Sequence, residues 1–144
     1  MSKLAWIIVS LAALTVANSA MAQTSTPDLR GTWKGESETV ILGAGNSHHD
    51  ASAGAEPRLN SVAFTMTIDK QDGRRFSGTF SSARASEKVI AVVSRTGAIY
   101  MVDDDGHDIG MILAPNRMEL CYLKQSVESH IASCTELTRQ QQKP

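Results

Sequence analysis

Four histidines are the side chains in this 144-residue chain with the most versatile chemistry. Neutral imidazole nitrogens together with carboxylate oxygens suit a divalent transition metal such as zinc. None of the histidines has another one two or four residues away, the spacings that place two ligands on one face of a strand or a helix. A metal site is therefore a hypothesis that depends on the fold. Its candidate ligands are His48, His49, His107 and His130.

The two cysteines predict a disulfide instead of a metal site or a nucleophile. Residues 118–124 and 131–138 are predicted to form a hairpin that turns near Val127. Cys121 and Cys134 lie at equal distances from that turn, so the hairpin places them directly opposite each other. Such a bond closes a loop of about 14 residues and contributes roughly 3 kcal/mol on the loop-entropy model.

Acid–base and nucleophilic chemistry find little support in the sequence. Glu119 and Glu136 face each other in the same hairpin, a paired-carboxylate arrangement that could raise one pKa. Strand alternation places both outside the sheet, which favours ordinary surface charges. No nucleophile elbow, phosphate-binding glycine loop or Cys–His couple occurs in the sequence. We therefore predict that the protein is not an enzyme, with no catalytic residues and no cofactor.

A repeated alternation of apolar and polar residues predicts that β-strands carry these side chains. No helical period competes with it, and turn pairs such as Asp72-Gly73 and Pro115-Asn116 separate the runs. Short turns make neighbouring strands antiparallel. The eight predicted strands are residues 31–42, 61–68, 75–81, 88–94, 98–102, 109–113, 118–124 and 131–138.

Eight sequential strands with one apolar face are best accommodated by closing the sheet on itself, because closure buries that face and removes both edges. The sequence thus predicts an all-β fold, an antiparallel eight-stranded up-and-down β-barrel with one disulfide. A sandwich of two sheets is the alternative. The residues expected to point inward are Val62, Phe64, Met66, Ile68, Phe76, Phe80, Ile109, Met111, Leu113, Leu120 and Tyr122.

The first residues are typical of an export signal. Lys3 precedes an apolar run over residues 4–16, and Ala20-Met21-Ala22 has the small-x-small pattern of a signal-peptidase site. The run is shorter than the roughly 20 residues that span a bilayer. We therefore predict a periplasmic or secreted protein with no integral membrane segment after cleavage. Its parts are a signal peptide (1–22), a flexible tail (23–28), the barrel (29–139) and a C-terminal tail (140–144).

Gly31-Thr32-Trp33, at the start of the first strand, resembles the calycin group of barrels, which includes lipocalins and avidins. Phe64-Thr65-Met66-Thr67 and Gly78-Thr79-Phe80 extend the resemblance to avidin-like sequences. The resemblance implies a calycin-like barrel with a closed base.

The same resemblance implies structural roles for Gly31 and Trp33, and for Arg139, which would cover the Trp33 ring at the base as in lipocalins. Biotin binders of this group carry an Asn where this chain has Gly35, and they have further tryptophans that this chain lacks. Biotin binding is therefore not expected, and only the fold is carried over.

In an up-and-down barrel the loops alternate between two ends, which collects all four histidines and an excess of carboxylates at one end and most arginines at the other. The long loop 43–58 lies at the histidine end and by analogy matches the lid of lipocalins. The hypothesis is a binding protein for a small apolar or amphipathic ligand that enters the end gated by this loop. Its candidate ligand-binding residues are Ser37, Thr39, Phe64, Met101, Met111, Tyr122 and Ser133.

Other kinds of partner stay open. Periplasmic protease inhibitors are similar in being small disulfide-bonded eight-stranded barrels with an early Gly-x-Trp and a flexible N-terminal tail. An inhibitor-like or other protein–protein interaction module is therefore the alternative. The basic end could instead meet anionic lipid or polymer. A net charge of -1 offers no global field for nucleic acid, so no nucleic-acid partner is predicted.

Overall fold

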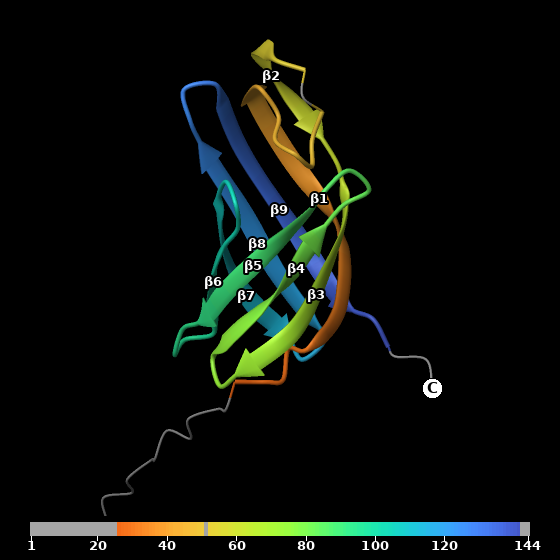
Figure 1. Cartoon of the computed structure of the whole chain (residues 1–144), viewed down its shortest axis with the longest axis vertical. Helices are drawn as coiled ribbons and strands as arrows, with labels where there is room; N and C mark the ends of the chain where they lie inside the picture. The colour runs from red at the N-terminus through yellow and green to blue at the C-terminus, as the bar shows by residue number, and fades with distance from the viewer. Residues whose placement is uncertain (1–25, 51, 142–144) are drawn as a thin grey trace, which may run out of the picture.

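The strands of this chain form one closed sheet (Figure 1). They are β1 (Gly31–Gly43), β2 (Gly54–Asn60), β3 (Ala63–Asp72), β4 (Arg75–Ser81), β5 (Ser86–Val93), β6 (Ala98–Val102), β7 (His107–Ala114), β8 (Arg117–Gln125) and β9 (Ser129–Arg139). Strands β3 to β8 each pair with the next along the chain, and β1 pairs with both β3 and β9. These pairings close an antiparallel eight-stranded barrel. They confirm the predicted fold class and exclude the two-sheet sandwich.

The structure, a computed structural model, describes residues 26–50 and 52–141. The predicted signal peptide 1–22 lies outside the described residues. Leu29 N–H donates to the Gln71 side-chain oxygen at 2.7 Å, and the Gln71 amide donates to the Pro27 carbonyl at 2.9 Å. The chain is therefore anchored to β3 from Pro27 onward, so two residues of the predicted tail (23–28) are held against the barrel.

β1 is the longest strand and has three neighbours. Its first half pairs with β3 and its second half with β2, while β9 runs along its other edge. The additional strand β2 begins inside the predicted loop 43–58 and extends two residues beyond it, so only residues 44–53 connect it to β1. Sequence pattern could not identify β2, because none of its side chains is buried and it lacks the alternation of a half-buried strand.

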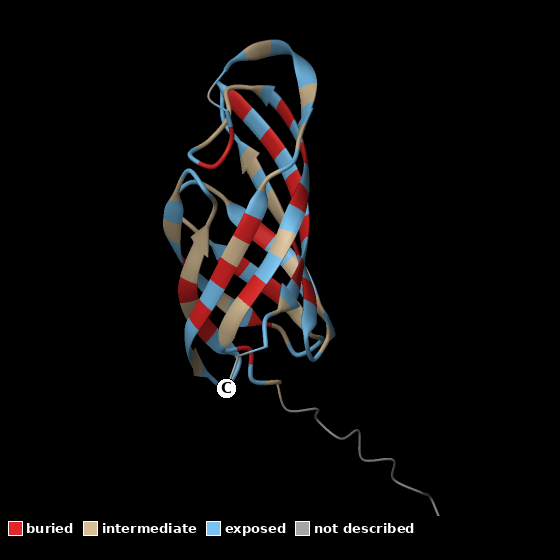
Figure 2. Ribbon diagram, turned by 90° about the vertical axis from the view of Figure 1, so that its right-hand side faces the viewer, coloured by how far each residue is buried: buried red, intermediate tan, exposed pale blue. Residues whose placement is uncertain are grey.

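The closed base of the barrel holds the apolar core, and Figure 2 shows the buried residues as alternating bands along the strands. Trp33 is fully buried, and its indole Nε1 donates a hydrogen bond to the Leu29 carbonyl at 2.9 Å. The Arg139 guanidinium lies over the indole, 4.7 Å from the ring centroid. The core consists of Leu29, Trp33, Met66, Ile68, Phe76, Val89, Val93, Ile99, Met101, Met118, Leu120 and Leu137.

The register of β8 and β9 places Cys121 opposite Cys134, and the two form the predicted disulfide. The bond lies on the outside of the wall, where Cys134 is exposed. Glu119 and Glu136 also face each other across these strands. Arg117 donates hydrogen bonds to Glu136 at 2.8 and 2.9 Å and lowers the pKa of that carboxyl. Both carboxylates are surface charges.

Strand β7 has the opposite orientation to the one that its apolar pattern predicts. Ile109, Met111 and Leu113 were expected to be inside, but they are 45%, 51% and 44% exposed on the outer wall. Facing residues of paired strands point to the same side, and Asp108 faces the inward Met101 of β6. The register with neighbouring strands therefore outweighs the pattern of β7 itself. The other residues predicted to point inward are buried or partly buried.

Candidate functional site

The connection between β1 and β2 folds back into the open end of the barrel and carries two buried histidines. His48 and His49 are 4% and 3% exposed. The Asn46 side-chain oxygen accepts hydrogen bonds from both of their backbone N–H groups, at 3.1 and 3.2 Å. The two imidazoles pack against Phe64, with ring centroids 5.2 and 6.4 Å away. We call residues 46–49 the plug and the end that they fill the mouth.

Beneath the plug the lumen is polar and nearly filled. Ser37, Thr39 and Ser133 form a chain of buried hydroxyls, with oxygen–oxygen distances of 3.0 Å for the first pair and 2.7 Å for the second. The cavity that remains has a volume of about 20 Å³, room for about one water molecule. A small organic ligand does not fit there while the plug is seated. The lumen thus does not provide the space expected behind loop 43–58.

The seven residues predicted to line a ligand site do not share one surface. Met101 packs in the apolar core cluster, opposite Asp108 in the register of β6 and β7. Met111 is exposed on the outer wall, so the prediction that it lines the lumen is corrected, and the reason is the register of β7 described above. Those that do point into the barrel are Ser37, Thr39, Phe64, Met101, Tyr122 and Ser133.

Asp108 adds a buried carboxyl group to the same cavity. It is 4% exposed. Burial raises the pKa of Asp108 to about 7, and the charges of Asp103 and Glu87 add to the effect. Sequence reasoning assigns Asp108 to a loop of surface carboxylates because the strand is expected to begin at Ile109. The strand instead begins at His107, which turns Asp108 inward.

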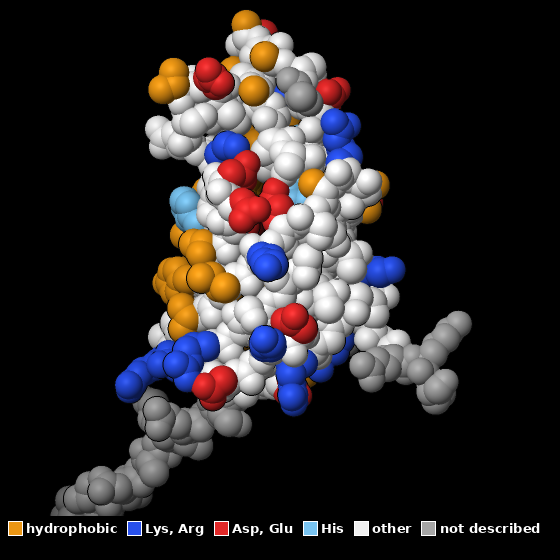
Figure 3. All heavy atoms as spheres, viewed as in Figure 1, with side chains coloured by type: hydrophobic (Ala, Val, Ile, Leu, Met, Phe, Trp, Pro, Cys, Tyr) orange, Lys and Arg blue, Asp and Glu red, His pale blue; other side chains and the backbone are white. Residues whose placement is uncertain are grey.

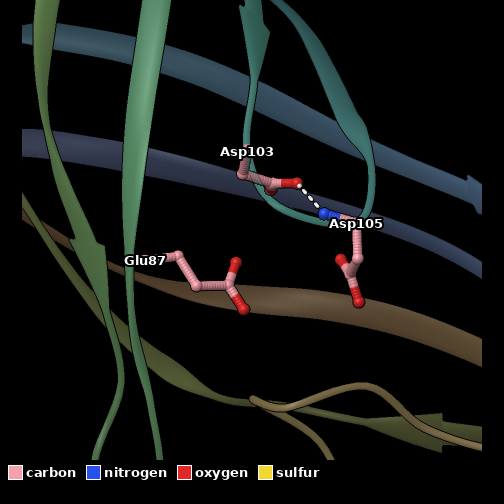
Figure 4. A group of neighbouring side chains, drawn as sticks. All are labelled: Glu87, Asp103 and Asp105. Atoms are coloured by element: carbon pink, nitrogen blue, oxygen red, sulfur yellow. Dashed lines mark hydrogen bonds between the residues drawn. The ribbon is translucent and has the colours of Figure 1, made fainter.

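Three more carboxylates gather on the rim of the mouth (Figure 4). Glu87 belongs to β5, and Asp103 and Asp105 belong to the turn between β6 and β7. One carboxylate oxygen from each of the three lies within 4.8 Å of the others. The Asp103 side chain accepts hydrogen bonds from the backbone N–H groups of Asp105 and Gly106, at 3.1 and 2.7 Å, which holds the turn in place.

Asp105 is also bound from the barrel wall. Tyr122 Oη donates to one carboxylate oxygen at 2.6 Å, and Lys124 Nζ donates to the other at 2.5 Å. Burial alone would raise the pKa of Asp105, but the hydrogen bonds from Lys124 and Tyr122 outweigh it and lower the pKa. Burial, reinforced by the bond to Asp105, raises the pKa of the Tyr122 phenol. Tyr122 therefore acts here as a hydrogen-bond donor.

The structure divides the four histidines between two surfaces, which corrects the expectation that they converge. His48 and His49 lie inside the mouth. Burial lowers the pKa of His49, and the neighbouring His48 adds to the effect, which favours a neutral ring. His107 and His130 are exposed on the outer wall, because their positions in β7 and β9 alternate with the inward Asp108 and Ile131.

A continuous apolar surface covers the outside of β5, β6 and β7. Tyr100 is paired with both Val92 and Ile109, so the three side chains form a row across the strands. An open groove of about 780 Å³ runs over this face, and Lys70 and Arg75 line its end toward the base. Figure 3 shows hydrophobic side chains on this flank, with Lys and Arg beneath them. The exposed apolar residues, 42% to 62% accessible, are Ile90, Val92, Tyr100, Val102, Ile109, Met111 and Leu113.

The sequence contains a signal for this outer groove. β5 ends in the unbroken apolar run 89–93, and β6 is apolar from end to end. Such runs are typical of strands that contact apolar material on both faces. A second groove of about 480 Å³ adjoins the first at His107 and crosses β8, β9 and β1. Its exposed apolar side chains are Val40, Leu42, Pro57, Leu123 and Ala132.

Comparison with known proteins yields one weak likeness of fold. No family model and no curated protein matches the sequence. Among solved structures, the barrel is similar to the S-type phycobiliprotein lyase CPES from Guillardia theta, with 10% identity and a TM-score of 0.38 over 80% of this chain and 90% of that chain. An eight-stranded antiparallel barrel fits a calycin-like fold. At this identity and TM-score the likeness transfers neither a ligand nor a reaction.

The prediction that the protein is not an enzyme is corrected by the same finding. The matching structure is described as a lyase. The lack of a familiar catalytic motif in the sequence does not exclude catalysis, and we do not carry the exclusion forward. Within residues 26–50 and 52–141 there is also no helix long and apolar enough to cross a bilayer.

Proposed function

We propose that this protein binds an amphipathic molecule, with an apolar body and an anionic group, in the outer groove over β3 to β7. The observation that carries the proposal is the contiguous row of exposed apolar side chains on β5, β6 and β7 beside a groove of about 780 Å³. Ligand pockets commonly have volumes of about 300–1,000 Å³ and mostly apolar walls. A scattered exposed residue needs no explanation, whereas a contiguous patch of this kind marks a binding surface.

The charges around the groove favour an anionic head group. Lys70 and Arg75 both line the end of the groove that faces the base of the barrel. Arg75 is paired with Asp72, which leaves Lys70 as the cation with no ion pair among the described residues. A carboxylate or phosphate at this end would lie beside Lys70 while the attached chain covers Val92 and Tyr100.

The filled lumen is a second argument for a ligand site on the outer wall. The plug and the hydroxyl chain leave space for about one water molecule, so the apolar contact area available to an organic ligand is on the outer wall. Burial of that area contributes about 25 cal/mol per Å². The free energy of binding would therefore come mainly from the apolar side chains, and the cations would orient the ligand.

Titration with a dansyl-labelled undecanoic acid tests this proposal. The expected result is saturable binding with a blue shift of the dansyl emission. The double variant Ile90→Ser, Val102→Ser should bind at least about tenfold more weakly, since it removes two facing apolar side chains from the groove. Leu59→Ser is the matched control, because Leu59 is 85% exposed on β2, outside the groove.

The head group is tested separately by competition. Palmitic acid should displace the dansyl probe more effectively than palmityl alcohol, and Lys70→Gln should remove that difference. No saturable binding, or equal binding by the wild type and the double variant, would overturn the proposal. Equal displacement by acid and alcohol would overturn the anionic head group.

A protein partner is the second candidate function, and the adjoining groove favours it. The apolar surface continues beyond His107 over β8, β9 and β1, farther than a single small ligand would cover. Light scattering after size exclusion tests this candidate with a second copy of the chain as partner. A dimer that Ile90→Ser with Val102→Ser dissociates would favour it, and a monomer at every concentration would count against it.

Export is proposed on two features, the signal-like residues 1–22 and the disulfide, since disulfides persist in oxidising compartments. Expression in a bacterium followed by fractionation and N-terminal sequencing checks this. The expected product is periplasmic and begins at Gln23. A cytoplasmic product that keeps Met1 would contradict the proposal.

A further inference from the structure

We propose that His48, Glu87, Asp103 and Asp105 form a binding site for a divalent transition-metal ion at the mouth of the barrel. The four side chains come from three separate elements: the plug, β5 and the β6–β7 turn. A metal bound there would tether the plug to the barrel wall. This site lies at the rim, whereas the proposed ligand groove lies on the outer wall, so each can be tested without the other.

The carboxylates already lie close enough to share an ion. One oxygen from each of Glu87, Asp103 and Asp105 lies within 4.8 Å of the other two, and all three side chains converge in Figure 4. Ligands about 2.0–2.2 Å from a tetrahedral ion are roughly 3.4 Å apart. Small rotations of these side chains, of which that of Glu87 is 10% and that of Asp105 30% exposed, would bring the oxygens to that separation with no change in the backbone.

His48 is the observation that distinguishes this cluster from a group of surface acids. Its side chain is 4% exposed, and its Nε2 lies 3.4 Å from a Glu87 carboxylate oxygen. That nitrogen makes no hydrogen bond to any of the residues that the structure describes. A buried nitrogen without a partner is unfavourable, and a metal ion between His48 and the carboxylates would satisfy it.

The other ring nitrogen of His48 is held in a way that suits metal binding. His48 Nδ1 lies 2.9 Å from the Ser82 hydroxyl oxygen, which also accepts a hydrogen bond from the Arg84 backbone N–H. In the tautomer in which the ring donates to the Ser82 hydroxyl, Nδ1 is the protonated nitrogen. The lone pair is then on Nε2, facing Glu87. Metal-bound histidines commonly have this arrangement, with the second nitrogen donating to a neighbouring oxygen.

The charge of the rim also favours a cation. Three carboxylates meet there, and Lys124, bonded to Asp105, is the one lysine or arginine paired with them among the described residues. One nitrogen and three carboxylate oxygens suit zinc or manganese. Calcium takes oxygen ligands alone and would not use His48.

The test uses the full-length protein after treatment with EDTA and dialysis. Calorimetric titration with ZnCl₂ and MnCl₂ should show one ion per chain, and the thermal midpoint should rise on saturation. Glu87→Gln and His48→Gln should each weaken binding at least about tenfold, since each removes one ligand. His130→Gln and Glu128→Gln are matched controls of the same chemistry on exposed positions outside the cluster, and they should bind as the wild type does.

Two further measurements keep the result unambiguous. Circular dichroism of the metal-free variants should match the metal-free wild type, which excludes a folding defect as the cause of weaker binding. A nitrogen NMR spectrum should show the His48 Nε2 resonance shifting when zinc is added. The proposal is overturned if neither ion binds stoichiometrically, if His130→Gln weakens binding as much as His48→Gln, or if calcium binds as tightly as zinc without moving that resonance.

Discussion

The base and the mouth of the barrel are built from opposite kinds of side chain. At the base, apolar residues from strands all around the barrel pack against Trp33, whose one polar atom donates to the Leu29 carbonyl. At the mouth, hydroxyls, imidazoles and carboxylates fill the same cylinder and form hydrogen bonds among themselves. The base therefore supplies stability that is insensitive to pH, whereas the mouth holds groups whose charge can change.

The contrast between base and mouth shows where this fold can bind an ion or a proton. Apolar packing is satisfied by its own contacts, so the base has no reason to bind anything. At the mouth the plug brings His48 and His49 from outside the wall into contact with groups on β3 and β5. The stability of the mouth depends on this short loop, and the binding of an ion or a proton can change how firmly the loop is held.

Removing the indole at the base should have the largest effect on stability. Trp33→Ala leaves a cavity in the core and is expected to lower the free energy of unfolding by about 3–5 kcal/mol, as measured by urea denaturation. Val127→Ala is the control, because Val127 is fully exposed. A loss below about 1 kcal/mol for Trp33→Ala would mean that the base does not supply most of the stability.

Removing the disulfide should lower the free energy of unfolding by less, and it should weaken the base and the mouth alike. Cys121 and Cys134 join β8 to β9 midway along the outer wall, so the bond restricts the unfolded chain without touching either end. The double variant with serine at both positions should lose roughly 3 kcal/mol. Hydrogen exchange should show that amide protection falls at both the base and the mouth. A loss of protection confined to the mouth would contradict this expectation.

The sequence predicted the barrel and its base because local signals and register agree there. Turn residues and alternation gave β4 and β6 their observed bounds, and the position of the cysteines relative to Val127 gave the register of β8 and β9. Trp33 lies at the base with Arg139 over its ring. The strand bounds and the β8–β9 register depend on residues close in sequence or on one hairpin, whereas the Trp33–Arg139 contact joins the first and last strands and was implied by the resemblance to lipocalins.

The mouth could not be predicted in the same way, because its contacts are not local. Asn46 and His48 carry no periodic signal, and only the fold shows that His48 reaches Ser82 and Glu87. The predicted orientation of β7 was wrong because the apolar pattern of β7 itself disagrees with the register that β6 and β8 impose. Because of this error the inward position of Asp108 was not predicted. Met111 was predicted to line the lumen, although it lies on the outer wall beside the groove.

Removing the ionisable group of Asp108 should have the smallest effect on the free energy of unfolding. This effect should depend on pH, which distinguishes the mouth from the base. Its carboxyl ionises near pKa 3.8 in the unfolded chain and at about 7 in the folded one. Between these values the folded state holds more protons, so the contribution of Asp108 to stability is complete below pH 3.8 and is lost as the pH rises through 7.

Asp108→Asn cannot ionise and should lose this part of the pH dependence. Relative to the wild type, its free energy of unfolding should rise by about 2 kcal/mol between pH 4 and pH 8, since each unit of pKa shift corresponds to about 1.4 kcal/mol and relaxation of the site reduces the sum. Urea denaturation across that range measures the difference, with Asp104→Asn in the exposed part of the turn as control. Trp33→Ala should run parallel to the wild type over the same range, because no titratable group is removed at the base. Parallel curves for Asp108→Asn as well would show that the Asp108 carboxyl is solvated, and the mouth would then be as insensitive to pH as the base.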